Sequence, residues 1–135
     1  MLIKTTPDTE KAKSILKMTE NTLELVKGLR EEKFATHIIK DNYDILRELT
    51  AIIALLDGYK TVGEGAHKEL IDYLRTHYKH KIIGNELQLF DELRIIRNKI
   101  AYDGFFVTLD YLKRNKESIA TIIQKLKELI NLKIK

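Results

Sequence analysis

The chain has 135 residues, contains no cysteine and carries a formal net charge of +4 at pH 7. Its length suits a single domain, residues 1–135, with its own hydrophobic core, and the absence of cysteine excludes disulfides and thiolate chemistry. No apolar run approaches the roughly 18 residues that span a bilayer, and the first residues do not resemble a secretory signal, so we expect a cytoplasmic protein that enters no membrane.

The first two predicted helices are long and end at glycines. Thr6 is expected to cap the first helix, with Pro7 at its first position, and the helix should end near Gly28. The second helix should run from about residue 31 to 57 and stop at Gly58. Its isoleucines and leucines repeat every three, four or seven residues over an unusually wide face. We therefore expect it to be the central helix of a bundle.

Three further helices follow a glycine-rich connection at residues 58–65. They are expected at about residues 66–78, at about 85–101 and from Thr108 onward. The apolar link at 105–107 is expected to pack on the bundle, and the lysine-rich tail at 131–135 to fray. The predicted core of the third and last helices comprises Leu70, Ile71, Leu74, Leu112, Ile119, Ile122, Ile123, Leu126, Leu129 and Ile130. No strand-like alternation is present, so we predict an all-α bundle of about five helices, an up-and-down four-helix core plus one short helix.

The fourth predicted helix combines an apolar face with a polar stripe. A 4-3-4 spacing places four apolar residues on one face, which should be buried: Leu89, Leu93, Ile96 and Ile100. At about 100° per residue, Asp91, Asn98 and Tyr102 fall on nearly the opposite side, and Arg94 and Arg97 flank them. We expect the functional site of this protein to lie on that stripe.

The pattern Arg97-Asn98-x-x-x-Tyr102 resembles the Arg-x(4–6)-His motif of HEPN domains (higher eukaryotes and prokaryotes nucleotide-binding), with tyrosine in place of the family's histidine. The passage from Leu55–Lys60 into His67–Leu74 is similar to the connection between the second and third helices of these domains. The resemblance implies a helical homodimer joined through the fourth helix and part of the second. It also implies that arginine and histidine from two subunits meet across a two-fold axis to cleave RNA.

The tyrosine changes what this motif can do. A histidine can move a proton from a ribose 2′-hydroxyl or to the leaving oxygen, while an arginine stabilises the charge on the phosphate. A tyrosine with its ordinary pKa of about 10 is a poor base at pH 7, although it can donate a proton or a hydrogen bond. Five helical residues turn through about 500°, so Arg97 and Tyr102 lie about 140° apart on one helix. They meet only if the helix unwinds before Gly104 or if a second subunit contributes one of them.

Three functional hypotheses follow, and they leave open whether the protein is an enzyme. The first is a dimeric, non-catalytic HEPN-like protein that binds RNA or a nucleotide and works with a partner such as a nucleotidyltransferase. The second is a metal-independent HEPN endoribonuclease, the toxin of a toxin–antitoxin pair, with Arg97 and Tyr102 as catalytic residues at the dimer interface. The third is a helical dimer with a purely structural or interaction role. Asn98, Arg94 and Asp91 are the predicted ligand-binding residues, with Asp91 orienting the arginines.

Other polar groups give weaker signals. His77 and His80 are three residues apart but have no third ligand nearby, so we predict no metal site and no cofactor. Residues 58–65 lack the Gly-Lys-Ser/Thr ending of a phosphate-binding P-loop. A basic patch with tyrosines interleaved is either an RNA contact or a solvated helix end, and it comprises Tyr73, Arg75, Tyr78, Lys79, His80 and Lys81.

Overall fold

The computed structural model describes residues 1–135 and contains five α-helices, which make up 77% of the chain. Their bounds are α1 Thr9–Lys27, α2 Glu31–Asp57, α3 Ala66–His77, α4 Gly84–Asp103 and α5 Leu109–Ile134. The predicted class and number of helices are confirmed, and α3 is the expected short helix. None of the five combines the length and apolar character that a membrane-spanning helix requires.

Two short strands, which the sequence did not predict, are paired at one end of the bundle. Strand β1 is Leu2–Lys4 and strand β2 is Tyr59–Thr61, and the two are antiparallel with Ile3 opposite Lys60. The prediction of a chain without strands is therefore wrong. Each strand has only three residues, too few to show alternation, and the pairing joins segments more than fifty positions apart.

Local chemistry explains where the helices begin and end. Asp8, rather than Thr6, caps α1, because its side chain accepts a hydrogen bond from Lys11 N at 3.0 Å. Gly58 ends α2 in the left-handed region, with φ at 90°. A Cβ at this position would lie 3.3 Å from the carbonyl oxygen of Thr5, so the close approach of the N-terminal segment also requires glycine.

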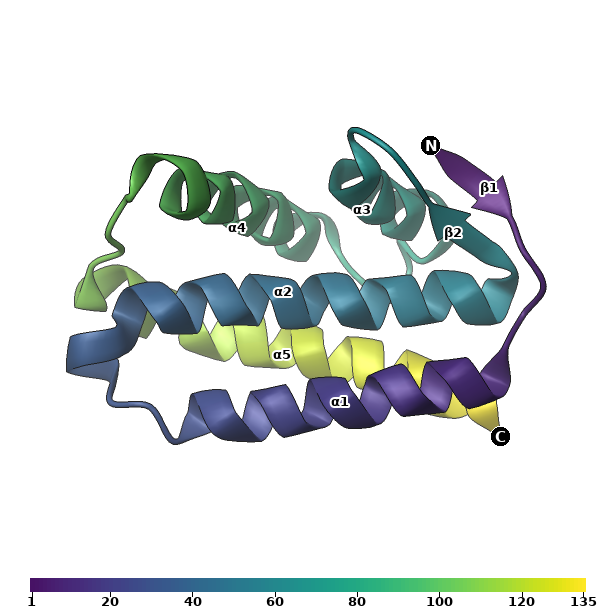
Figure 1. Ribbon diagram of the computed structural model, residues 1–135, viewed down its shortest axis with the longest axis horizontal. Helices are drawn as coiled ribbons and strands as arrows, with labels where there is room; N and C mark the ends of the chain where they lie inside the picture. Colours follow the sequence, from purple (N-terminus) through teal and green to yellow (C-terminus); the bar gives the residue numbers. More distant parts are fainter.

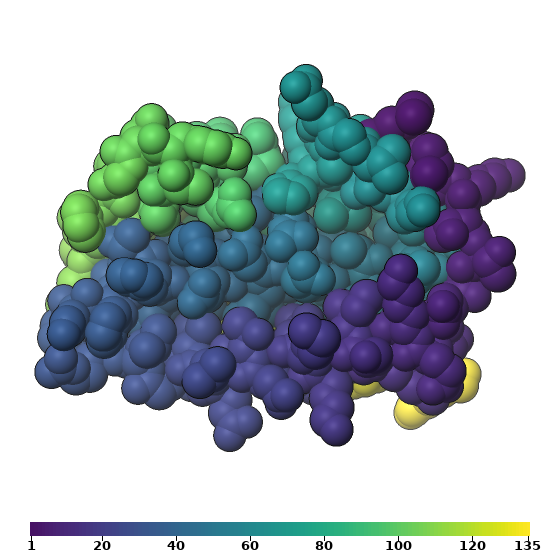
Figure 2. Space-filling view, viewed as in Figure 1, coloured from purple at the N-terminus to yellow at the C-terminus, as the bar shows by residue number.

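Helix α2 is the central element, as predicted. In Figure 1 it passes between α1, α5 and the pair formed by α3 and α4, and it contributes twelve of the buried residues. Helices α1 and α4 run away from the end of the molecule that holds both termini, and α2 and α5 run back towards it (Figure 1). All of the predicted core residues of α3 and α5 are buried. In the space-filling view, α4 and the segment from β2 into α3 form separate ridges above α2 (Figure 2).

The C-terminal end of α5 is fixed rather than frayed. Lys133 Nζ lies 2.6 Å from Asp57 Oδ1, and the second carboxylate oxygen of Asp57 accepts hydrogen bonds from Tyr73 at 2.5 Å and Tyr78 at 2.6 Å. One carboxylate at the end of α2 thus holds α3 and α5 together. The tail prediction is wrong because the sequence around Lys133 does not reveal this distant partner.

The apolar link after α4 differs from its prediction as well. Val107 is buried, and its N–H donates to Thr36 Oγ1 at 2.9 Å. Phe105 and Phe106 do not pack into the bundle, since 45% and 81% of their surfaces are exposed. This link therefore leaves two aromatic rings at the surface beside α4.

Candidate functional site

Helix α4 turns its two arginines towards α2 rather than away from the core. Its fully buried residues are Leu87, Phe90 and Leu93. Three residues of the predicted core face are only half-buried: Leu89, Ile96 and Ile100. Arg94 and Arg97 follow Phe90 at steps of four and seven, so they continue the buried side of the helix. The predicted burial direction is therefore wrong by about a quarter of a turn, because the sequence of one helix does not fix its rotation against its neighbour.

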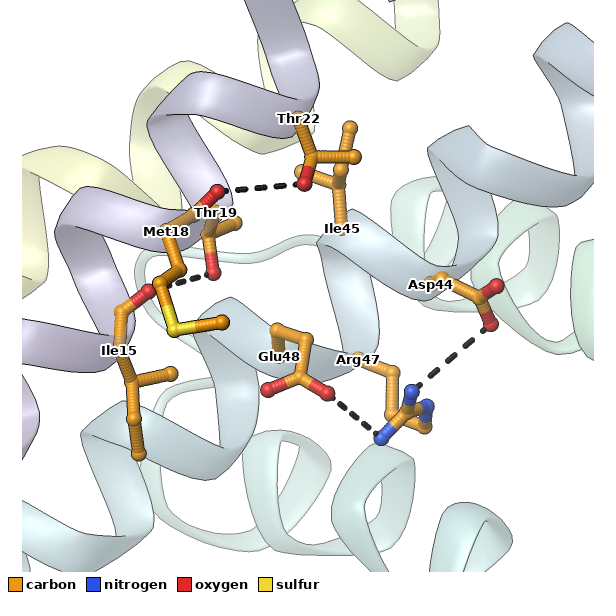
Figure 3. Close-up of a pocket in the computed structure, with 8 residues that line it drawn as sticks. All are labelled: Ile15, Met18, Thr19, Thr22, Asp44, Ile45, Arg47 and Glu48. Atoms are coloured by element: carbon orange, nitrogen blue, oxygen red, sulfur yellow. Dashed lines mark hydrogen bonds and ion pairs between the residues drawn. The ribbon is translucent and has the colours of Figure 1, made fainter.

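Arg97 contacts Asp44 of α2, and Asp44 in turn contacts Arg47; the sequence analysis singled out neither residue of α2. Arg97 Nε lies 3.6 Å from Asp44 Oδ1, and Arg47 Nη2 lies 3.8 Å from the same oxygen. Arg47 also contacts Glu48, with 3.0 Å between Nη1 and Oε1. Figure 3 shows the Arg47 guanidinium between Asp44 and Glu48, beside a depression of about 310 Å³ between α1 and α2.

Arg94 and Asp91 pair as the sequence analysis expected, with 2.8 Å between Arg94 Nε and Asp91 Oδ1. The expectation that Asp91 orients an arginine is thus consistent with the structure for Arg94, whereas Arg97 is held by α2. Asn98 lies one turn after Arg94, and both line a depression of about 220 Å³ between α4 and the start of α3. We call Arg47, Arg94 and Arg97, together with Asp44, the arginine cluster.

The arginine cluster and the neighbouring Tyr43 contain buried polar atoms with no hydrogen-bond partner in the chain. They are Tyr43 Oη, Asp44 Oδ1, Arg47 Nε and Arg97 Nε. No other buried side-chain nitrogen or oxygen of the protein shares this condition. Buried polar groups without partners are uncommon, and several in one place are typical of a binding site.

Two further residues, Tyr43 and His67, lie against this cluster. Tyr43 is fully buried, and its ring centroid is 6.2 Å from that of His67 and 5.9 Å from that of Phe90. Burial raises the pKa of Tyr43 to about 12, against the opposing effect of the arginines, so its hydroxyl stays protonated. Burial, with Arg47 and Arg97 nearby, lowers the pKa of His67. His67 is therefore mainly neutral at pH 7.

Surface depressions connect these residues into one series. The depression beside α1 and a second one, of about 330 Å³, share Arg47. This second depression shares His67 with the one between α3 and α4, where Arg94 and Asn98 lie. Arg47 and Arg94 of the arginine cluster are thus reached from neighbouring depressions that share lining residues.

Tyr102 lies apart from the arginine cluster within one chain. Helix α4 continues through Asp103, so it does not unwind between Arg97 and Gly104, and the two motif residues remain on different sides of it. The ring of Tyr102 is 81% exposed, whereas only 24% of the Arg97 side chain is accessible. The structure therefore brings Arg94, Arg97, Asp91 and Asn98 to one region and leaves Tyr102 one turn beyond it.

The two tyrosines of the basic patch at the end of α3 are held by contacts within the bundle. The hydroxyls of Tyr73 and Tyr78 are both bonded to Asp57, and Tyr73 is only 4% exposed. His77 packs on Tyr73, with 4.5 Å between ring centroids, and His80 stacks on Tyr78 at 6.5 Å. Neither tyrosine is free to stack on a base from outside.

Sequence reasoning missed Tyr43, Asp44 and Arg47, and it did not place His67 beside the arginines. A signal was present, because polar residues at 41–44 and 47–48 interrupt the apolar pattern of the most buried helix. No protein-family model, curated protein sequence or solved structure matches this chain.

Proposed function

We propose that this protein is a HEPN-like, non-catalytic module that binds RNA or a nucleotide, and that Arg47, Arg94 and Arg97 hold its phosphate groups. The observation that carries the proposal is the convergence of three arginines from α2 and α4, two of them with a buried Nε that has no hydrogen-bond partner. Arginine contacts phosphate through several N–H groups at once, so unused donors in a cleft suit this ligand.

The carboxylates beside the arginines do not use up these donors. The nearest contact of Arg97 to a carboxylate is 3.6 Å, which is beyond a normal hydrogen bond. Arg94 uses its Nε on Asp91, which leaves its two terminal nitrogens free of that contact. Asp44, Glu48 and Asp91 therefore hold the guanidinium groups in place and reduce their mutual repulsion, while N–H groups remain for a ligand.

The series of depressions favours a ligand longer than one small molecule. It runs from Asn98 past His67 and Arg47 to α1, and its parts share residues. A single-stranded RNA has phosphates at regular intervals and can follow such a path. Arg97 is joined to this path through Asp44, which lines the depression beside α1, so it is a suitable residue for a test.

The decisive experiment measures binding of fluorescently labelled single-stranded RNA by anisotropy at several salt concentrations. Wild-type protein should bind, and the affinity should fall steeply with salt, because phosphate contacts release counterions. Arg97→Ala should lose most of the binding. Arg75→Ala is the matched control, since it removes the same charge from an exposed ion pair on α3. If the two variants bind equally well, the arginine cluster is not the RNA site.

The proposal includes a homodimer through the side of α4 that faces α5. A depression of about 240 Å³ lies there and is lined by apolar residues that include Ile96, Phe105 and Phe106. The exposed ring of Phe106 gives a second copy an apolar surface to cover. A nucleotidyltransferase partner, which the HEPN resemblance implies, would compete for this surface. Sedimentation should show a dimer for the wild type and a monomer for Phe106→Glu.

The endoribonuclease remains the second candidate, and the exposure of Tyr102 favours it. Its ring is 81% accessible, so a second chain could bring Tyr102 to the Arg97 of its partner. Labelled RNA should then be cleaved by the wild type and not by Arg97→Ala. Activity that appears only in Tyr102→His would instead identify a HEPN scaffold that has lost its catalysis.

A further inference from the structure

The depression between α3 and α4 has the size and lining of a site for one small polar group. Its volume is about 220 Å³, below the roughly 300–1,000 Å³ of sites that enclose a whole small molecule. Only one of its seven lining residues is hydrophobic. These residues are Gly63, Gly65, Ala66, His67, Lys68, Arg94 and Asn98.

One wall of this depression is the first turn of α3, where backbone N–H groups lack hydrogen-bond partners. Gly65, the N-cap residue, has φ at 76° and provides no side-chain cap. At the start of the helix, Ala66 N donates to Gly63 O and Glu69 N donates to Gly65 O. The backbone N–H groups of His67 and Lys68, which lie between them, donate to no backbone carbonyl. These free N–H groups, at the positive end of the helix dipole, favour an anion.

The side chains that line the depression add positive charge, and an unpartnered polar group lies behind one of them. Arg94 faces the start of α3 from α4, and Lys68 is exposed with no carboxylate within 4 Å. The acid in the first turn of α3, Glu69, is engaged elsewhere, because it pairs with the N-terminal ammonium. Tyr43 supplies an independent observation: it is 0% exposed, its hydroxyl has no partner, and its ring packs against His67. Tyr43 does not itself line the depression and reaches it only through this contact with His67, which does.

Tyr102 lies next to this site on α4. Arg94, Asn98 and Tyr102 follow one another at intervals of four residues, so they lie along one side of the helix, about 6 Å apart per step. The single step from Asn98 to Tyr102 is comparable with the separation of a phosphate and its base within one nucleotide, whereas Arg94 lies two steps, about 12 Å along the helix, from Tyr102. The exposed Tyr102 is therefore placed to stack on a base whose phosphate is bound on the Asn98 side of the depression.

We propose that the depression between α3 and α4 binds the terminal phosphate of an RNA or a mononucleotide, and that Tyr102 stacks on the adjoining base. A terminal phosphate has three free oxygens and up to two negative charges, which matches the several donors of this site better than an internal phosphate does. The proposal rests on the proposed function, because it assigns the end of the same RNA path to this depression. Tyr102 then has a role that needs its ring and not its hydroxyl.

The test compares short RNAs of one sequence that carry a 5′-phosphate, a 3′-phosphate or only hydroxyl ends. One phosphorylated end should bind at least tenfold more tightly than the hydroxyl-ended RNA, and the two phosphorylated arms identify which end is read. Lys68→Glu should remove this preference. Lys113→Glu, the same charge change at an exposed lysine of α5, should keep it.

The stacking role is tested with adenosine monophosphate and inorganic phosphate by calorimetry. Tyr102→Ala should weaken binding of the nucleotide about tenfold and leave inorganic phosphate unaffected, whereas Tyr102→Phe should bind both like the wild type. Leu25→Ala, which removes an exposed apolar side chain of α1, should change neither. Loss of nucleotide binding in Tyr102→Phe overturns the stacking role.

The outcomes separate this proposal from the proposed function. Binding of RNA that depends on Arg97 but is indifferent to terminal phosphate overturns the end-specific site and leaves the proposed function in place. Absence of RNA and nucleotide binding overturns both. If Lys68→Glu still binds RNA with a terminal phosphate more tightly than hydroxyl-ended RNA, the phosphate binds elsewhere on the protein. That result overturns the inference.

Discussion

Replacing Asp57 should be among the most destabilising changes to this protein outside its hydrophobic core. Its carboxylate accepts hydrogen bonds from Tyr73, Tyr78 and Lys133 at 2.5–2.6 Å, and 21% of the side chain is exposed. A hydrogen bond to a charged group contributes about 1.5–3 kcal/mol, but three that share one acceptor are not additive. Partial exposure reduces the sum further. We expect Asp57→Ala to lower the free energy of unfolding by about 3–4 kcal/mol, since it also leaves the buried Tyr73 hydroxyl unpaired.

The pH dependence of stability gives a second measurement of the same carboxylate. Burial alone would raise the pKa of Asp57, but the hydrogen bonds from Lys133, Tyr73 and Tyr78 outweigh it and hold the pKa below its ordinary value of 3.8. A pKa that is lower in the folded state means stability that is present above the unfolded value and is lost as pH falls through the folded value. Wild-type protein should therefore lose stability below about pH 4 more steeply than Asp57→Asn.

Urea denaturation at pH 7 and pH 3 measures both effects. Asp72→Ala is the matched control, because it removes a carboxylate from an exposed pair with Arg75 on α3 and should cost less than about 1 kcal/mol. If Asp57→Ala is as stable as Asp72→Ala, or if Asp57→Asn keeps the full acid dependence, the carboxylate does not hold α3 and α5 to α2.

Three other predictions concern single residues. Gly58→Ala should lower the free energy of unfolding by about 1–2 kcal/mol, because alanine is strained at φ 90° and its Cβ would approach Thr5. Thermal denaturation measures this change, and stability equal to the wild type would contradict the geometry. The NMR titration midpoint of the His67 ring should lie below pH 6.5, since burial and the nearby arginines disfavour its charged form. A midpoint above 6.5 would mean that the ring does not lie beside the arginine cluster. Tyr43→Phe should leave the free energy of unfolding within about 1 kcal/mol of the wild type, because the hydroxyl has no partner to lose. A larger loss would reveal a hydrogen bond of Tyr43 that the structure lacks.

The sequence predicted those parts of the fold that local chemistry determines. The bounds of α2 follow from a long apolar repeat that ends at a glycine, and both signals are contained in consecutive residues. The core of α5 follows from helical periodicity for the same reason. The strands and the bond from Lys133 to Asp57 could not be predicted, because each joins segments far apart in the chain.

The candidate site was predicted in part. Arg94, Arg97, Asp91 and Asn98 were identified from one helix, where their spacing is visible. The rotation of α4 about its axis is set by Phe90 and Leu93 against α2, and only this rotation brings Arg97 to Asp44. The contributions of α2 and of His67 depend on the packing of three helices, which no single segment of the sequence encodes.

The position of α2 has a consequence for how the site responds to a ligand. Asp44 and Arg47 project from the middle of the most buried helix, so their backbone should exchange amide hydrogens only when the whole protein unfolds. This half of the site is rigid before any ligand arrives, and binding should cost little conformational entropy there. The other half begins at a connection with two left-handed glycines, Gly63 and Gly65, where few contacts restrain the chain. Most of the ordering that accompanies binding should therefore occur at the start of α3, which makes that connection the place where changes in loop flexibility alter affinity without altering the arginines.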